Sequence, residues 1–157
     1  MQSPRPESAN TPEPAGLARR LGAMLYDSLL LFAVSWAVTA VVIGLRVLGS
    51  GEQAVRGAGG PAASGLLLQL PLLVALAGFF VWFWTRSGQT LGMQSWRLRV
   101  ETEDGARLDW RTALLRLLLA LLSAICLGAG YWWILLDAQK RSWHDRWTRT
   151  RVVLLPR

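Results

Sequence analysis

An acidic residue lies inside the first long apolar segment of the chain. Asp27 is the only formally charged residue between Leu21 and Leu45. An ionisable side chain in a bilayer costs about 2.5–3.5 kcal/mol on insertion scales, so its presence requires a neutralising partner or a function. A carboxylate at this depth could exchange a proton for a cation on an ion or solute path. Alternatively, it could join two helices through an ion pair or a hydrogen bond.

Arg20 precedes Asp27 by seven residues. This spacing is close to two helical turns, which places the two side chains on one helix face and about 10 Å apart. They are aligned but do not touch, so Asp27 should meet a cation from another element. Arg116, near the start of the last apolar run, is the best candidate. His144 or Arg146 could serve if the C-terminal segment folds back.

Arg116 and the His144-Asp145 pair also have simpler interpretations. Arg116 lies close to the start of its apolar run, so its side chain can reach the lipid headgroups. A helix-capping or packing pair is favoured over an acid–base dyad for His144 and Asp145, because no nucleophile or metal-ligand spacing accompanies them. The sequence therefore predicts no catalytic residue and no metal site.

Three apolar segments must position these residues. They cover residues 21–45, 66–84 and 113–136. The first contains 25 residues, and at about 1.5 Å per residue this length crosses a hydrocarbon core of about 30 Å. Glycine-rich residues 46–65 predict a flexible connection, and proline-rich residues 1–16 predict a disordered tail. We expect an all-α integral membrane protein with one transmembrane domain over residues 17–155.

The third apolar segment leaves two topologies open. Gly128-Ala129-Gly130 interrupts it, so it either crosses once or turns back as a re-entrant or kinked hairpin. With one crossing, eight Lys and Arg residues fall on each side of the membrane, whereas with a turn back the count is 14 against two. Because Lys and Arg favour the cytoplasmic side, we favour the turn back, with both termini cytoplasmic. Residues 152–155 could then pair with a strand around residues 98–100.

A polar stretch, residues 85–112, separates the second and third apolar segments. Residues 96–101 and 106–110 alternate polar and apolar side chains, and Glu103-Asp104-Gly105 supplies turn chemistry between them. This pattern predicts a small cytoplasmic β-hairpin that packs on its own helices. Asp109 is a candidate N-cap for the helix that follows.

Composition restricts the class of protein. The 157 residues are 52% hydrophobic and 17% charged, which fits one compact membrane domain rather than an ordinary soluble one. The net charge is +7, but nearly all the basic residues flank apolar segments, as expected beside anionic lipid, so no nucleic-acid partner is predicted. One cysteine and one histidine leave no basis for a disulfide or a zinc site, and no cofactor is predicted.

Several short sequence pieces, taken in order, resemble the RDD family of membrane proteins. The resemblance runs from about Ala15 to Val153 and covers nearly the whole chain. It rests on Arg20 and Asp27, Gly88-Gln89-Thr90-Leu91-Gly92, Leu98-Arg99-Val100 with its Asp-Gly turn, and the closing Asp137…Arg141…His144-Asp145…Thr150-Arg151-Val152-Val153.

The resemblance implies which residues carry the family's function. The Arg, Asp and Asp of the family name correspond to Arg20, Asp27 and Asp145, with Asp137 as a supporting candidate. A basic residue usually follows the Gly-Gln-Thr-Leu-Gly segment, whereas Met93 stands there in this chain. The family also implies a bacterial plasma (inner) membrane and an activity for which transport, including sodium/proton antiport, has been proposed.

Three hypotheses for function follow. The first is ion or small-solute transport through Asp27, which would require a homo-oligomer because the second apolar segment offers only Gln69 as a polar side chain. The alternative is a non-catalytic membrane scaffold that binds a protein partner or anionic lipid. An enzyme is least favoured, because no nucleophile, metal or cofactor constellation is present in the sequence. In each case the lipid bilayer is the expected surrounding.

Overall fold

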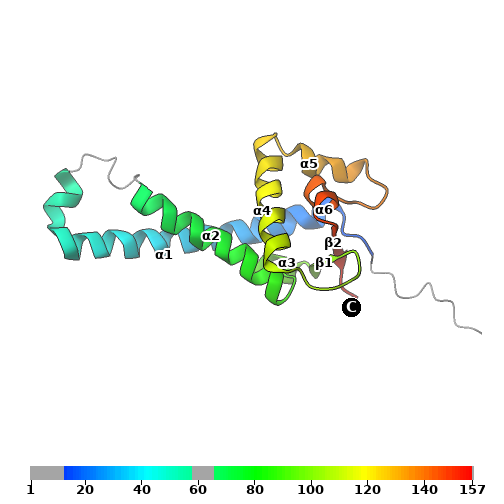
Figure 1. Ribbon diagram of the computed structural model, residues 1–157, viewed down its shortest axis with the longest axis horizontal. Helices are drawn as coiled ribbons and strands as arrows, with labels where there is room; N and C mark the ends of the chain where they lie inside the picture. Colours follow the sequence, from blue (N-terminus) through cyan, green and yellow to red (C-terminus); the bar gives the residue numbers. More distant parts are fainter. Residues whose placement is uncertain (1–12, 58–65, 157) are drawn as a thin grey trace, which may run out of the picture.

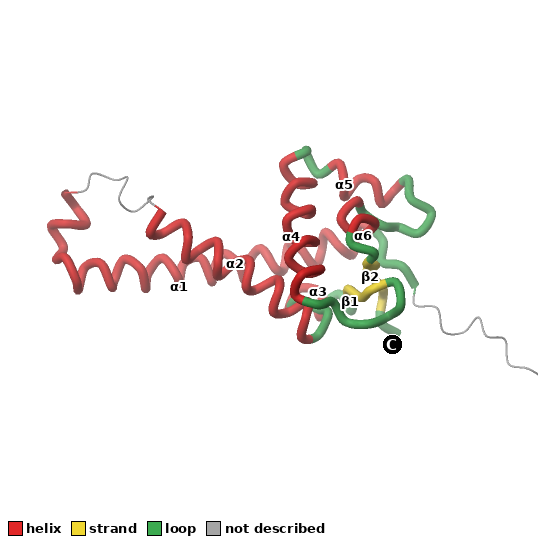
Figure 2. The backbone as a smooth tube through the Cα atoms, viewed as in Figure 1, coloured by secondary structure: helices red, strands yellow, loops and turns green. Residues whose placement is uncertain are grey.

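The computed structural model describes residues 13–57 and 66–156 and is mostly helical, with one small sheet (Figure 1). Figure 2 separates helices, strands and loops along the same trace. The elements in chain order are α1 (Leu17–Gly57), α2 (Leu66–Arg86), α3 (Leu91–Ser95), β1 (Leu98–Thr102), α4 (Trp110–Ile125), α5 (Ala129–Trp132), the 3-10 helix η2 (Trp133–Leu135), α6 (Trp143–Trp147) and β2 (Thr150–Leu154).

Helix α1 is longer than the predicted span of residues 21–45. Its stretch Leu17–Gly49 contains 33 residues and is long and apolar enough to cross a membrane. The helix then continues to Gly57, with non-helical backbone at Gly51. The prediction of a flexible connection from residue 46 is therefore wrong for residues 46–57, because a single glycine costs a helix only about 1 kcal/mol and the chain is kinked at Gly51 without losing its helices on either side. The rest of that connection, residues 58–65, lies outside the described residues.

Helix α2 lies beside α1 and matches the predicted second span, ending two residues later at Arg86. Its stretch Gln69–Arg86 is the second candidate membrane span. Pro71 lies inside the helix, in its second turn, where it removes one intrahelical N–H donor. Arg86 lies over the ring of Trp82 at 5.4 Å from the ring centre. Figure 1 shows α1 and α2 extending together away from the rest of the chain.

The third apolar segment is bent. Helix α4 and the α5–η2 pair are long and apolar enough to cross a membrane only when they are taken together, and they are bent by 102° relative to one another. Leu127 and Gly128 adopt left-handed backbone at the break, with φ of 55° and 74°. This finding removes a straight third span and agrees with the predicted kinked or re-entrant segment.

The sheet differs from the predicted hairpin. Strand β1 pairs antiparallel with β2, from Leu98↔Leu154 to Thr102↔Thr150. Residues 106–109 form no strand, because the chain after the turn at Gly105 runs directly into α4. The hairpin prediction is therefore wrong, while the suggested pairing of residues 152–155 with residues 98–100 is confirmed.

The chain before α1 also contacts the sheet. The amide of Ala15 donates to the Val152 carbonyl at 2.9 Å, and the amide of Leu154 donates to the Glu13 carbonyl at 2.8 Å. Residues 13–15 thus line the free edge of β2, although the predicted tail extended to residue 16. Residues 1–12 of that tail lie outside the described part.

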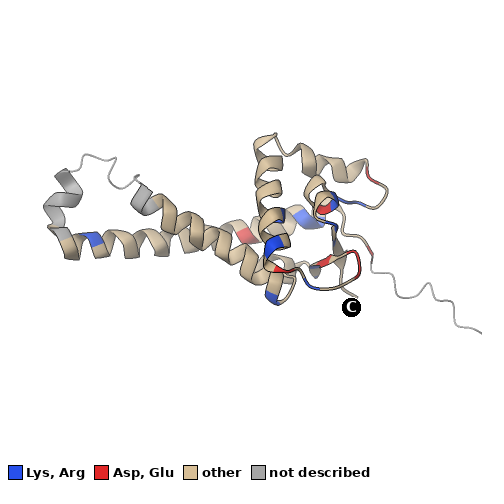
Figure 3. Cartoon of the chain, viewed as in Figure 1, with Lys and Arg blue, Asp and Glu red and all other residues tan. Residues whose placement is uncertain are grey.

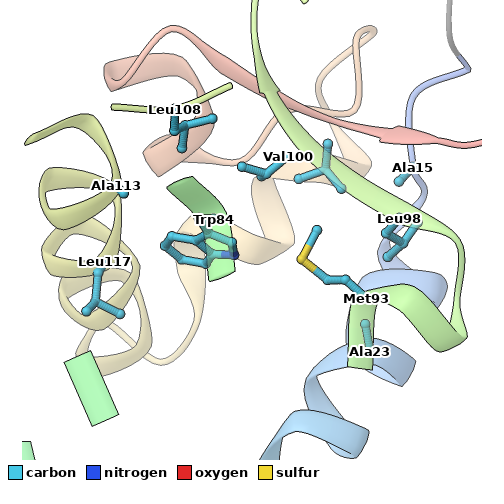
Figure 4. Packing of buried hydrophobic residues seen from close by; sticks show 10 residues of the cluster. Ala15, Ala23, Trp84, Met93, Leu98, Val100, Leu108, Ala113 and Leu117 are labelled. Carbon is cyan, nitrogen blue, oxygen red and sulfur yellow. The ribbon is translucent and has the colours of Figure 1, made fainter. Parts of the chain in front are cut away.

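The buried core lies among the elements at one end of the molecule (Figure 1), and Figure 4 shows its packing from close by. It forms where the start of α1, the end of α2, α3, the start of α4 and the sheet meet. Most of the length of α1 and α2 beyond this core exposes large apolar side chains, as expected for helices surrounded by lipid. The core side chains are Ala15, Ala23, Trp84, Met93, Leu98, Val100, Leu108, Ala113, Leu117 and Val152.

Candidate functional site

Arg20 occupies the first turn of α1 and is 6% exposed. Its Nε donates to the Ala15 carbonyl at 3.1 Å, and its Nη2 donates to the Lys140 carbonyl at 2.7 Å. Its Nη1 donates to Oδ2 of Asp145 at 2.5 Å. Arg20 therefore joins α1 to the loop before α6 and to α6 itself.

Asp145 is the common acceptor of two arginines. Besides the contact with Arg20, its Oδ1 lies 2.6 Å from Nη1 of Arg116. Asp145 is also the third residue of α6, where it forms a capping box with Ser142, the N-cap. Burial would raise the pKa of the Asp145 carboxyl, but the charges of Arg116 and Arg20 outweigh burial and hold that pKa well below its usual range. The capping prediction for Asp145 is confirmed.

Arg116 does not reach toward headgroups as the sequence suggested. It is 3% exposed, contacts Asp145, and donates to the Thr150 hydroxyl. Its guanidinium lies over the ring of Trp84, 5.3 Å from the ring centre. The snorkelling prediction is wrong because a fully buried carboxylate lies within reach and outcompetes water as a partner.

Asp27 has a different partner from the predicted cation. Its Oδ2 accepts from the Thr90 hydroxyl at 2.5 Å, and its Oδ1 accepts from the Gly92 amide at 2.8 Å. Within residues 13–57 and 66–156, the structure shows no Arg, Lys or His paired with it, so the predicted contacts with Arg116, His144 or Arg146 are wrong. Thr90 is the N-cap of α3, and the free amides of a helix start suit a carboxylate.

Gly92 makes the contact with Asp27 sterically feasible. A Cβ atom at this position would clash with the Ala23 carbonyl and lie 2.8 Å from the Asp27 carboxyl carbon. Sequence reasoning singled out the Gly-Gln-Thr-Leu-Gly segment only through family resemblance. The physical signal was Thr90 in an N-cap position two residues before a glycine.

His144 and Asp137 lie in different surroundings. The His144 ring packs on Tyr131 with 4.9 Å between ring centres, and its Nε2 lies 3.9 Å from Oδ1 of Asp145. Burial, and then the charge of Arg116, lowers the pKa of His144 to about 3, so the ring is neutral near pH 7. Asp137 lies apart from this cluster and accepts from the Arg141 amide at 2.9 Å.

A cavity of about 320 Å³ lies between α1, α2, α3, α4 and the sheet. Arg20, Asp27 and Arg116 line it, so it connects the two sets of polar contacts. Its other walls are mainly apolar. Met93, which takes the place of the family's usual basic residue, is 8% exposed and also lines the cavity. The remaining lining residues include Trp84, Leu31, Phe80, Thr90, Leu117, Ala120, Leu121, Tyr131 and His144.

Across residues 13–57 and 66–156, no group of three His, Cys, Asp or Glu side chains is placed to hold a metal ion. Both carboxylates of the triad accept hydrogen bonds from the protein itself. We call Arg20, Arg116, Asp145 and His144 the charged cluster.

Comparison with known proteins identifies the family of the chain. A family model described as the RDD family matches residues 14–149. Searches of curated proteins and of solved structures found no match. The match covers most of the chain and includes Arg20, Asp27 and Asp145. Together with two or three candidate spans, it indicates a membrane protein. The chain belongs to the RDD family.

Proposed function

We propose that this protein is a non-catalytic membrane scaffold that binds anionic lipid, and that the family triad holds the scaffold together. The observation that carries the proposal is that both carboxylates of the triad (Arg20, Asp27 and Asp145) already have partners within the protein. Asp145 is fully buried between two arginines, and Asp27 accepts from Thr90 and Gly92. A carboxylate that must bind and release an ion in each cycle would have to break these contacts every time.

Charge distribution supports a cytoplasmic position for the end that carries the sheet. In Figure 3 most of the Lys and Arg positions of the described residues lie at that end. Arg46 belongs to the part of α1 that is distant in sequence from Arg19 and Arg20. Lys and Arg are enriched on the cytoplasmic side of membrane proteins and attract anionic lipid there. We therefore place both ends of the described chain in the cytoplasm of a bacterial cell whose inner membrane holds α1 and α2.

Cysteine labelling tests this orientation. In a Cys126→Ala background, Gly49→Cys and Gln139→Cys place single exposed thiols at opposite ends of the described structure. We expect a membrane-impermeant maleimide to label Gly49→Cys in intact cells and Gln139→Cys only after lysis. Labelling of Gln139→Cys from outside would overturn the orientation.

Transport is the second candidate, because Asp27 lies in a candidate span and also lines the cavity. Proteoliposomes with a sodium gradient and an internal pH dye separate the two functions. The scaffold proposal expects no pH change above that of empty liposomes. A sodium-driven pH change in wild type that Asp27→Asn abolishes, while the variant stays folded, would establish transport and remove the scaffold proposal.

A further inference from the structure

Two buried N–H groups of the cavity lining have no hydrogen-bond acceptor among the described residues. They are Nε of Arg116 and Nε1 of Trp84. The two side chains are stacked, with the guanidinium 5.3 Å from the centre of the indole ring. In Figure 4 the indole nitrogen of Trp84 points to the side on which Met93 lies. An unsatisfied buried donor costs about 1–3 kcal/mol, so two neighbouring ones require an explanation.

The charged cluster carries more positive than negative charge. Arg20 and Arg116 share the single carboxylate of Asp145. His144 contributes no charge near pH 7, because its pKa is lowered to about 3 by burial and then by Arg116. Asp27 also lines the cavity, but its two oxygens face Thr90 and Gly92, and it lies two helical turns from Arg20. One guanidinium is therefore left without a full counter-charge in a buried place, which favours an oxyanion there.

The rest of the cavity is apolar. Leu31 of α1, Phe80 of α2, and Ala120 and Leu121 of α4 form its walls away from the charged cluster. Its volume of about 320 Å³ is within the range of small-molecule sites, roughly 300–1,000 Å³. A ligand that fits must therefore combine an anionic group at one end with a hydrocarbon chain at the other.

We propose that this cavity binds a single-chain or phospholipid amphiphile whose carboxylate or phosphate oxygen accepts from Arg116 Nε and Trp84 Nε1 and whose acyl chain lies along Phe80 and Ala120. The inference rests on the proposed function, because it names the lipid class that the scaffold binds and its site. A free fatty acid and an anionic phospholipid offer the same chemistry, so the test must separate them.

The experiment uses the full chain, purified and delipidated in a neutral detergent, and the fluorescent probe 11-(dansylamino)undecanoic acid. We expect saturable binding that lauric acid displaces and dodecanol, which lacks the charge, does not. Displacement by phosphatidylglycerol but not by phosphatidylcholine would identify a phospholipid as the second source. Absence of saturable binding, or equal displacement by lauric acid and dodecanol, would overturn the proposal.

Two variants with matched controls locate the site. Ala120→Phe fills the apolar part of the cavity and should weaken probe binding at least tenfold, whereas Ala33→Phe, at an exposed position of α1 that does not line the cavity, should not. Trp84→Phe keeps an aromatic ring but removes the Nε1 donor together with the second ring, so it should weaken binding of the acid by about tenfold. Trp82→Phe, on the same helix but 61% exposed, is its control.

The outcomes also separate this inference from the proposed function. If Ala120→Phe binds the probe as wild type does, the probe lies elsewhere and the cavity is not the site. The scaffold proposal is not affected by that result, because the proteoliposome experiment tests it separately. Conversely, sodium-driven flux with intact probe binding removes the scaffold proposal and leaves the ligand assignment supported.

Discussion

Replacing Asp145 with Asn should destabilise the protein more than any other single isosteric change in the described chain. The substitution keeps the shape of the side chain and leaves two buried guanidiniums, Arg20 and Arg116, without their carboxylate. Removing one partner of a buried ion pair costs about 3–5 kcal/mol, because the remaining charge is neither solvated nor paired. The amide oxygen of Asn can still accept from the Ser142 amide, so we assign the loss to the arginines and not to the helix cap.

The measurement is equilibrium unfolding by SDS in mixed micelles, followed by tryptophan fluorescence. Glu103→Gln is the control, because Glu103 also contacts an arginine at 2.6 Å but its side chain is 47% exposed. An exposed pair contributes less than about 1 kcal/mol. The double variant Asp145→Asn with Arg116→Gln should lose less stability than the sum of the losses of the two single variants, because both substitutions remove the same contact. An Asp145→Asn loss no larger than that of Glu103→Gln would refute the reasoning.

Three further predictions follow from the same contacts. His144 is the only histidine, and its pKa in the folded protein is about 3, below the ordinary 6.5. The unfolded chain therefore binds a proton more readily than the folded one, so the free energy of unfolding decreases as the pH falls from about 6.5 toward 3. Between pH 7 and pH 5 the loss should be about 2 kcal/mol and should vanish in His144→Asn, as measured by the same SDS titration. Gly92→Ala should lower the melting temperature of the detergent-solubilised protein because its Cβ meets the Asp27 carboxyl, whereas Gly78→Ala, with open space around it, should leave it equal or higher. Thr90→Val removes both the α3 cap and a donor to Asp27, and should cost about 2 kcal/mol in the same titration.

The sequence predicted those helices, strands and caps that are determined by residues close together in the chain. The apolar runs gave the two long helices and the bent third segment, and the N-cap role of Asp109 is confirmed by its bond from the Thr112 amide at 3.2 Å. Strand β1 was also predicted, since its alternation is a property of consecutive residues. Two partners were predicted for it: residues 106–110, favoured by the nearby Asp-Gly turn, are wrong, and residues 152–155, about 50 residues further along the chain, are confirmed.

The partner of Asp27 could not be predicted for a different reason. Charged side chains can be identified from residue types, so Arg116 was predicted as the partner of Asp27. One of the actual donors is a backbone amide, which every residue except proline carries. Which amide is free depends on where a short helix begins, and α3 is only five residues long. Arg116 instead pairs with Asp145, and this contact forms only because the C-terminal segment folds back onto α4.

The charged cluster explains why the third apolar segment turns back. Once α1 and α2 each cross a bilayer, the start of α1 and the chain after α2 lie on one side, and β1 and α4 begin there. Asp145, after the 102° bend, contacts Arg20 at the start of α1 and Arg116 in the second turn of α4. In the topology that we propose, a segment that begins and ends on the same side cannot cross the bilayer once, so the bent pair of α4 and α5–η2 is expected to enter and return. Asp145 therefore closes the base of this loop, and its loss should free the loop and the first membrane helix together.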